Sequence, residues 1–299
     1  MNYTKKSGFV TIAGRANVGK STLLNLLVGE KVAIVSHRPQ TTRNSITGIL
    51  NTDTAQIVFV DTPGMHKPKT KLSEFMVKNI KEALTDTDIV LFVVEPKNSA
   101  SEIDLSLLES FKASGQQVIL IINKTDTISA TEVAELITTF NSLFDFASII
   151  PTSAKGGKDR ELIISEIEKL LLPGAIFFPE DMITDQPEKQ IAAEIIREKA
   201  LKSLSDEIPH GIAVEIESFK EREESDILDI SAVIYCERQS HKGIIIGKNG
   251  KMLKLIGSRA REDMERFFDC RVNLQCWVKD KGDWRNNDRM LKNFGYTNQ

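Results

Sequence analysis

The chain has 299 residues, of which 41% are hydrophobic and 27% charged, and this composition is typical of a soluble protein with one or two domains. Its longest apolar runs, Ile89–Val94 and Val118–Ile122, are far too short to cross a bilayer. The first strand is predicted to begin so early that we expect no signal peptide. Three cysteines, an odd number without C-x-x-C spacing, exclude a disulfide frame and a zinc site (Cys236, Cys270, Cys276). We therefore expect a cytoplasmic protein with reduced, structural cysteines.

The net charge of −3 hides an asymmetry. Residues 241–299 contain 13 Lys and Arg against 7 Asp and Glu, whereas residues 1–240 contain 26 against 35. A basic end on an acidic protein suggests a polyanion partner for that end. A solvated charged surface is the alternative.

Strands and helices are predicted to alternate from residue 7 to about 172. Continuous apolar strands in such an alternation predict a mostly parallel sheet covered on both faces. We therefore expect an α/β domain over residues 1–172, with ligands at the carboxyl ends of its strands. The expected strands lie near 9–13, 46–51, 56–60, 89–94, 117–122 and 147–151, and the expected helices near 20–28, 71–83, 101–113, 131–143 and 158–171.

The first strand and the first helix are joined by a loop with the phosphate-loop pattern, Gly14-Arg15-Ala16-Asn17-Val18-Gly19-Lys20-Ser21. A phosphate bound there meets backbone N–H groups and the positive end of a helix dipole. Lys20 is expected to reach the β- and γ-phosphates, and the Ser21 hydroxyl is expected to hold Mg²⁺. We include the next residue, Thr22, in the expected nucleotide site.

Two further loops are predicted to reach the same phosphates. In Pro39-Gln40-Thr41-Thr42-Arg43, a threonine can place its hydroxyl on Mg²⁺ and its N–H on the γ-phosphate; we favour Thr42, with Thr41 as the alternative. This loop is expected to be ordered by GTP and released by GDP. In Asp61-Thr62-Pro63-Gly64, which follows a strand, Asp61 can hold Mg²⁺ through a water and the Gly64 N–H can approach the γ-phosphate. Alone, this tetrapeptide is also compatible with a plain turn.

The base is predicted to be guanine, on the strength of Asn123-Lys124-Thr125-Asp126. The Asp126 carboxylate can accept hydrogen bonds from the N1–H and N2–H₂ groups of guanine, a donor pair that adenine lacks. The Asn123 amide can reach N7, and the Lys124 stem can lie along the base. Ser153-Ala154-Lys155 would offer a backbone N–H to guanine O6.

Together, GRANVGKS, QTTR, DTPG, NKTD and SAK resemble the translation-factor-related GTPases, and among them the Era family. The resemblance implies a P-loop GTPase that converts GTP to GDP and phosphate. In that family a hydrophobic residue, here Met65, follows DTPG in place of a catalytic Gln, which implies slow intrinsic turnover. Members with a phosphate-loop Asn, matched here by Asn17, can use K⁺ near the phosphates; a loop-shaping side chain is the alternative. The expected catalytic residues are Asn17, Lys20, Thr42 and Gly64, and His66, a lone loop histidine expected in solvent, is not assigned as a general base.

A second domain is predicted after a Pro- and Gly-containing linker at 173–187. Helices near 188–206 and 251–268 and strands near 211–220, 227–236 and 271–278 surround Gly247-Lys248-Asn249-Gly250. Such a GXXG loop between two helices clamps about four nucleotides in KH domains, and Lys248, Lys251 and Lys254 add charge. A plain helix–helix turn is the alternative. The order of elements resembles a smaller α+β domain, the type II KH domain of the Era family, over residues 188–299.

The resemblance implies a monomeric switch that binds small-subunit ribosomal RNA near its 3′ end and acts in assembly of the 30S-type subunit. One alternative is an RNA-binding module with a regulatory GTP site and negligible turnover. The other is a membrane-surface or cell-division GTPase whose basic end meets anionic lipid. Peripheral association with the inner membrane surface is compatible with this alternative and also with the RNA-binding switch.

Overall fold

The structure, a computed structural model, describes residues 5–36, 38, 40–66, 68–97, 99–205, 208–223 and 225–296. The chain divides into two compact units, each considered by itself below. Two short segments from the N-terminal half pack with the C-terminal part of the chain, a grouping that the sequence analysis did not predict. The first unit comprises Met1–Ala33, Thr42–Lys67 and Met76–Asp185, and the second comprises Ile34–Thr41, Pro68–Phe75 and Gln186–Gln299.

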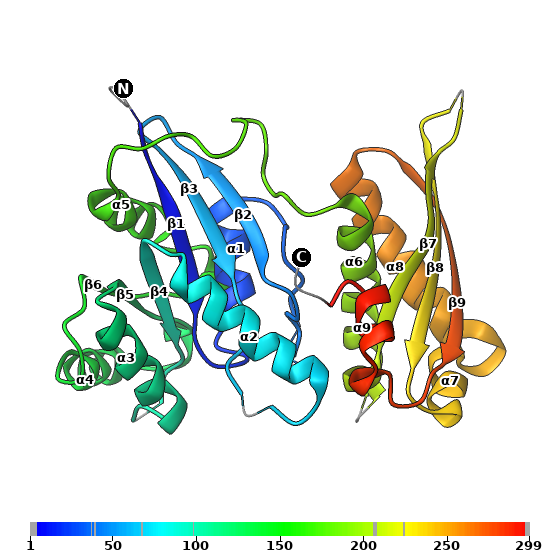
Figure 1. Cartoon of the computed structure of the whole chain (residues 1–299), viewed down its shortest axis with the longest axis horizontal. Coiled ribbons are helices and arrows are strands. Elements are labelled where there is room, and N and C mark those ends of the chain that lie inside the picture. Colours follow the sequence, from blue (N-terminus) through cyan, green and yellow to red (C-terminus); the bar gives the residue numbers. More distant parts are fainter. Residues whose placement is uncertain are drawn as a thin grey trace. The chain divides into compact units, whose positions relative to one another are not determined.

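The first unit is built on a six-stranded sheet in the order β2-β3-β1-β4-β5-β6 (Figure 1). Five strands are parallel, and the edge strand β2 is antiparallel to β3. All six residues of β4 are buried, as expected for an apolar strand covered on both faces. The predicted mostly parallel sheet is thereby confirmed. The strands are β1 (Lys6–Ala13), β2 (Ile46–Asn51), β3 (Ala55–Asp61), β4 (Ile89–Val94), β5 (Gln117–Ile122) and β6 (Ser148–Pro151).

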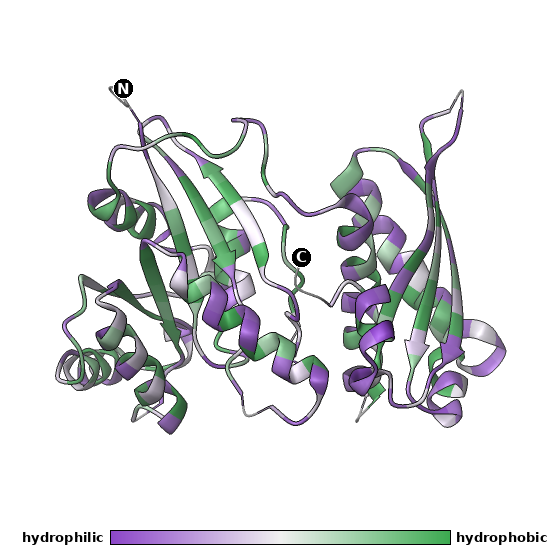
Figure 2. Ribbon diagram, in the orientation of Figure 1, coloured by the Kyte–Doolittle hydropathy of each residue, from purple (hydrophilic) through white to green (hydrophobic). Residues whose placement is uncertain are grey.

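Helices cover both faces of this sheet, and two separate cores result. Leu24 of α1 and Ile163 of α5 belong to one core, whereas Ile80 of α2, Phe111 of α3 and Phe140 of α4 belong to the other. The strands between these helices include apolar stretches, which are green in Figure 2. The helices are α1 (Lys20–Val28), α2 (Lys71–Thr85), α3 (Glu102–Ser114), α4 (Ala130–Asn141) and α5 (Arg160–Leu170), with 3₁₀ turns at Thr125–Thr127 and Ala154–Gly156.

The segment predicted as a linker lies against the sheet edge of the first unit. The Ile49 N–H of β2 donates to the Ile183 carbonyl at 2.9 Å. The fully buried side chain of Gln56 donates to the Phe178 carbonyl at 2.8 Å and accepts the Phe178 N–H at 3.0 Å. Residues 173–185 are consequently part of the first unit.

The second unit contains a three-stranded sheet in the order β7-β8-β9, with one antiparallel and one parallel pair. Helices α6 and α8 lie on one face of this sheet (Figure 1). Their side chains, including Ile196 and Met264, form a core with Ile230 of β8. This arrangement confirms the smaller α+β domain. Its elements are α6 (Glu188–Ser203), β7 (Ala213–Glu221), β8 (Ile227–Cys236), α7 (Gln239–Ile246), α8 (Lys251–Phe268), β9 (Arg271–Asp280) and α9 (Asp288–Asn293), with 3₁₀ turns at Ile208–Gly211, Lys248–Gly250 and Trp284–Asn286.

The two tryptophans differ in environment. Trp284 is fully buried and donates from Nε1 to the Gly211 carbonyl at 2.9 Å. Trp277 is 46% exposed, because alternate residues of the edge strand β9 point away from the helices. The three cysteines are free thiols. Of the helices in the described part of the chain, none has the length and apolar character needed to cross a membrane.

A candidate nucleotide site and a candidate RNA clamp

The predicted phosphate loop connects β1 to the N-terminus of α1. Gly19 is the N-cap of α1 and makes no side-chain cap bond, so the first-turn N–H groups are available to an anion. The buried Lys20 ammonium donates to the carbonyls of Gly14 and Arg15 at 3.1 and 2.9 Å. Burial lowers the pKa of Lys20 to about 8, and Asp61 opposes this shift. An anion at this loop would meet both a helix N-terminus and a buried cation.

Two hydroxyls and a carboxylate meet beside the loop. Ser21 Oγ lies 2.8 Å from Thr42 Oγ1 and donates to Asp61 Oδ2 at 2.6 Å, and Thr42 Oγ1 lies 3.3 Å from the same Oδ2. Neighbouring ligands of an octahedral Mg²⁺ are about 3 Å apart, so the spacing of the two hydroxyls suits this ion. The other carboxylate oxygen, Oδ1, is buried and has no hydrogen-bond partner within the described residues. Burial raises the pKa of Asp61 to about 6, against the influence of Lys20 and the two hydroxyls.

Two threonines were considered as Mg²⁺ ligands. Among the contacts of the described residues, only the Thr42 hydroxyl meets Ser21 Oγ and Asp61 Oδ2. Thr41 Oγ1 instead donates to the Arg38 carbonyl at 2.6 Å. The two neighbours thus point to different partners, and Thr42 is the one that the structure brings to Ser21.

Gly64 lies directly against the phosphate loop. A Cβ atom at this position would fall 2.5 Å from Ala16 Cα, so the close approach requires glycine. The following Met65 N–H donates to the Gly14 carbonyl at 3.3 Å. The prediction of a solvent-exposed His66 is wrong: this residue is half-buried, and its Nδ1 lies 2.8 Å from the Gly64 carbonyl.

The predicted base site is joined to the phosphate loop by Asn123, which is 3% exposed. Its Nδ2 donates to the Val18 carbonyl at 2.8 Å, and its Oδ1 accepts the Ala154 N–H at 2.9 Å. An amide nitrogen carries two hydrogens, so this geometry leaves one for a base. The exposed Asp126 carboxylate accepts from Ser153 Oγ at 2.6 Å, and this bond lowers the pKa of Asp126. Asp126 is therefore ionised, as acceptance from guanine requires.

The other residues predicted for this site lie in the same loops. Thr22 belongs to the first turn of α1, Thr62 and Pro63 separate Asp61 from Gly64, and Lys155 is exposed beside Ala154.

Two acidic residues that the sequence analysis missed hold the basic side chains of the site. Glu95, directly after β4, accepts from Lys124 Nζ at 2.9 Å, and Lys124 also donates to the Asn17 carbonyl at 2.6 Å. Asp104, in the first turn of α3, accepts from Arg15 Nε at 3.0 Å. Partial burial alone would raise the pKa of Glu95, but bonds from two lysines outweigh it and lower that pKa. A single acidic residue is hard to identify as functional from sequence. For these two residues, the one available sequence signal is that Glu95 follows the end of a strand.

The GXXG loop forms a tight turn between α7 and α8. Gly247 has φ 72°, and a Cβ atom there would lie 2.7 Å from Met252 Cβ, so the turn requires glycine. Lys248 and Asn249 are exposed. Gly250 is the N-cap of α8 without a side-chain cap bond, which leaves first-turn N–H groups for a phosphate.

The surroundings of the clamp are both basic and partly apolar. Lys251 and Lys254 are exposed on α8. Ile244 is 51% exposed, whereas Ile245 and Ile256 are fully buried in the core. Of these isoleucines, Ile244 is therefore the one available to a base.

Comparison with known proteins covers both units. Residues 9–124 match the family described as 50S ribosome-binding GTPase, and residues 207–285 match the KH domain family. GTPase Era of Caldanaerobacter subterraneus subsp. tengcongensis is 52% identical over 291 residues, covering 97% of this chain and 98% of the relative. GTPase Era of Clostridioides difficile is 50% identical over 295 residues, covering 98% of this chain and 99% of the relative.

Two solved structures are also similar, each with a TM-score of 0.94 and 40% identity over 98% of this chain and 100% of theirs. One is a Tyr-to-Ala variant of Aquifex aeolicus Era bound to GDP·AlF₄⁻. The other is Era in complex with MgGDPNP and nucleotides 1506–1542 of 16S ribosomal RNA.

Proposed function

The chain belongs to the Era family of GTPases, and on this premise we propose that it is a GTP-hydrolysing switch that binds small-subunit ribosomal RNA near its 3′ end in the cytoplasm and acts in assembly of that subunit. The observation that carries the proposal is that one chain combines two sites. The first is a phosphate loop with an ionised Asp126 at the predicted base site, and the second is a GXXG turn that leads into the N-terminus of α8, which has no side-chain cap bond. We propose residues 1–172 as the GTP-binding domain, 173–187 as the connection and 188–299 as the RNA-binding domain.

In the first domain, we assign the ligand as GTP or GDP with Mg²⁺. Ser21 and Thr42 are the proposed metal ligands, with Asp61 acting through a water, because their oxygens converge. Lys20 is assigned to the β- and γ-phosphates, and the Gly64 N–H to the γ-phosphate. A bound Mg²⁺ offsets phosphate charge, and the chain's own residues orient the phosphates around it.

Hydrolysis is proposed to proceed without a glutamine side chain, because Met65 follows Gly64. Asn17 is the residue assigned to a monovalent cation, and its left-handed backbone (φ 66°) equally serves the shape of the loop. Phosphate release measured in K⁺ and in Na⁺ separates the two roles. K⁺ stimulation that disappears in Asn17→Ala supports the cation role, whereas equal rates in both salts leave Asn17 a loop-shaping residue.

In the second domain, we assign the sugar-phosphate chain to Gly247, Lys248, Asn249 and Gly250, with Lys251 and Lys254 alongside. The first-turn N–H groups of α8 and the basic excess of residues 241–299 support this assignment.

The test is binding of a labelled oligonucleotide from the 3′ end of small-subunit ribosomal RNA to the full chain, with GDP and with a non-hydrolysable GTP analogue. A scrambled RNA and anionic lipid vesicles serve as competitors. Tighter sequence-specific binding in the GTP-analogue state is expected. Equal binding of the scrambled RNA in both nucleotide states would contradict the assigned RNA target. Displacement of the labelled RNA by vesicles at matched salt would favour a membrane-surface GTPase.

A further inference from the structure

The C-terminal half of α8 borders a pocket in the second unit that no sequence motif indicates. Its volume is about 420 Å³, within the usual range of ligand sites. Three arginines from different elements line it: Arg222 directly after β7, Arg261 on α8 and Arg271 at the start of β9. This arginine pocket lies at the end of the unit opposite α7, where α8 ends and β9 begins (Figure 1).

The three guanidinium groups keep hydrogen-bond donors for an anion. Arg222 donates from Nε and Nη2 to the two oxygens of Asp229, at 3.0 and 2.7 Å, and a guanidinium has five N–H donors. Arg261 Nε lies 4.0 Å from Glu265 Oε1, beyond hydrogen-bond distance. The exposed Arg271 side chain makes no hydrogen bond or ion pair with any other described residue. Donors from three elements therefore remain for a ligand.

The carboxylates at the pocket are already engaged. Asp229 accepts from Asn273 Nδ2 at 2.7 Å as well as from Arg222. Glu265 is the one carboxylate among the described lining residues, and its Oε1 accepts the Val272 N–H at 3.2 Å. Three cations thus line the pocket with a single anion. Because the planar guanidinium matches the geometry of phosphate oxygens, a phosphate group is the ligand class that fits.

The pocket continues the basic face of α8 that begins at the GXXG turn. Residues seven apart share a face of a helix, so Lys254 and Arg261 lie in one row. Between them are the small residues Gly257 and Ser258, and a Cβ atom at Gly257 would meet no atom within 4 Å. A sugar-phosphate chain therefore has room to pass along this row. The ten residues from Lys251 to Arg261 span about 15 Å of helix.

The turn after β7 favours a phosphate that belongs to a bound chain over a free ion. Glu221, Glu223 and Asp226 are exposed near Arg222 in sequence, and none of them lines the pocket. Their charge repels a free anion that approaches through solvent. A chain already held at the GXXG turn presents its next phosphates at a high effective concentration, so it depends less on such long-range attraction.

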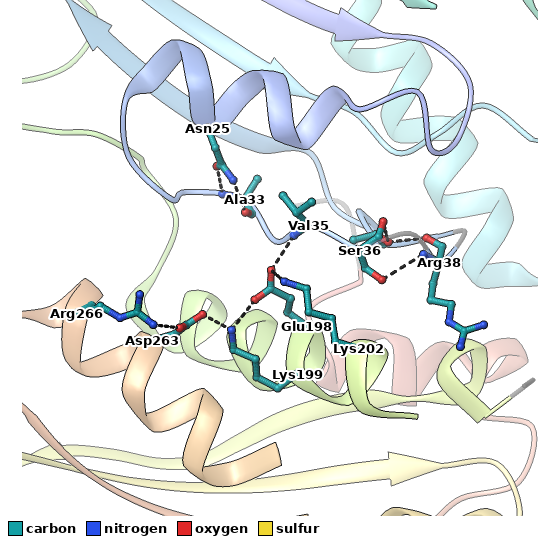
Figure 3. A network of polar contacts seen from close by, with 11 residues as sticks. Asn25, Ala33, Val35, Ser36, Arg38, Glu198, Lys199, Lys202, Asp263 and Arg266 are labelled. Atoms are coloured by element: carbon teal, nitrogen blue, oxygen red, sulfur yellow. Dashed lines mark hydrogen bonds and ion pairs between the residues drawn. The ribbon is translucent and has the colours of Figure 1, made fainter. Parts of the chain in front are cut away.

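The helix that forms one wall of the pocket is held in place. Asp263 of α8 accepts from Lys199 of α6 and from Arg266, and Lys199 also donates to Glu198 at 3.0 Å (Figure 3). The Lys199 and Asp263 side chains are largely buried, so breaking this pair would leave an uncompensated charge. The pair therefore fixes the half of α8 that carries Arg261.

We propose that the arginine pocket binds a phosphate of the RNA chain, about 15 Å along α8 from the GXXG turn. The inference rests on the proposed function, in which the GXXG turn holds RNA. It extends the contact beyond the roughly four nucleotides that such a turn clamps. It also makes Arg222, Arg261 and Arg271 RNA-binding residues.

The test measures affinity of the full chain, with a GTP analogue bound, for two oligonucleotides from the 3′ end of small-subunit ribosomal RNA. The short one has about four nucleotides, the length that a GXXG turn holds, and the long one is about three times as long. The variant is Arg261→Gln, Arg271→Gln, which leaves the bonds between Arg222 and Asp229 in place.

Affinity of this double variant for the long oligonucleotide is expected to fall about tenfold, with affinity for the short one within about twofold of wild type. The salt dependence of long-RNA binding should fall in slope by about 0.7 for each phosphate that is no longer neutralised. Arg271→Lys keeps the charge but lacks the planar fork, so it should retain the slope and lose part of the affinity.

Arg259→Gln, Arg289→Gln is the matched control. It removes the same charge from the same unit, and both arginines are exposed and lie outside the lining of the pocket. It should leave the ratio of long-RNA to short-RNA affinity unchanged. Inorganic phosphate added to the RNA-free protein at matched ionic strength tests the other source of this group, with the Nε–H signals of Arg261 and Arg271 followed by NMR.

Three results would overturn the inference: wild-type affinity for the long RNA in the double variant, equal losses for the short and the long RNA, or the same loss in the control. Saturable NMR shifts with inorganic phosphate, together with the first of these results, would assign the pocket to the free ion. If wild type binds target and scrambled RNA equally, the proposed function fails instead. If wild type selects the target RNA and the double variant matches it, only the role of the pocket fails.

Discussion

The Asn123 side chain donates to the Val18 carbonyl across 105 residues of sequence, at 2.8 Å. The same amide accepts the Ala154 N–H, so one buried side chain fixes the phosphate loop against the turn that follows β6. The guanine-recognition motif is thus also a structural connection within the first unit.

Asn123→Ala should lower both stability and nucleotide affinity. It leaves the Val18 carbonyl and the Ala154 N–H without a partner in the interior, at a cost of roughly 1–3 kcal/mol each. We expect the free energy of unfolding to fall by about 2–6 kcal/mol in urea titrations, and affinity for GDP and GTP to fall together. Wild-type stability in this variant would contradict the connecting role.

Asp126→Ala should remove the preference for guanine. Two hydrogen bonds to a charged acceptor disappear, and the ratio of GTP to ATP affinity should drop about a hundredfold. Asp145→Ala is the control, because Asp145 is an exposed aspartate of the same unit. A retained GTP preference in Asp126→Ala would move base recognition to other residues.

The buried pair Lys20 and Asp61 predicts how stability of the nucleotide-free protein varies with pH. The pKa of Asp61 is raised from 3.8 to about 6, so its contribution is present below pH 4 and is lost as pH rises through 6. The pKa of Lys20 is lowered from 10.5 to about 8, so its contribution is present above pH 10.5 and is lost as pH falls through 8.

Urea unfolding without Mg²⁺ at pH 4 to 7 isolates the first of these effects. Wild type should lose on the order of 1–3 kcal/mol over this range relative to Asp61→Asn, whose side chain does not titrate. The same variant should bind the Mg²⁺ complex of a GTP analogue more weakly. Parallel pH profiles for the two proteins would show that Asp61 does not carry the shift.

The double variant Lys248→Gln, Lys251→Gln should weaken RNA binding because two cations near the sugar-phosphate chain are removed. For single-stranded RNA, the slope of log affinity against log salt should fall by about 0.7 for each phosphate that is no longer neutralised. Lys220→Gln, on β7 of the same unit, should leave the slope unchanged, because Lys220 is exposed away from the GXXG turn. An unaltered slope in the double variant would argue against the clamp.

Much of the fold follows from local signals in the sequence. The bounds of β2, β4, β5, β8 and α8 match the predicted ranges, because apolar runs are ended there by polar residues or glycine. The start of α7 at Gln239 was not predicted, since Gln239-Ser240-His241-Lys242 lacks apolar periodicity. The helix forms there because Ile245 is buried in the core that α7 shares with the sheet.

Four of the five nucleotide motifs are predictable because each follows a parallel strand at the same edge of a sheet, whereas the Thr42 loop instead precedes β2. The supporting contacts are not, since they join residues far apart in sequence with no fixed spacing. Asp104 and Arg15 are 89 residues apart, and Lys124 and Asn17 are 107 residues apart. Local patterns contain no trace of either pairing.

The bond between Ile49 and Ile183 has a consequence for solubility. An edge strand presents unpaired backbone groups that invite another chain to add a strand, and β2 is such an edge. The segment at 173–185 occupies part of that edge, since it supplies the Ile183 carbonyl to the Ile49 N–H and fixes its own course through Gln56. It therefore shields the first unit from self-association, and a truncated protein ending at residue 172 would expose β2 as a template for aggregation.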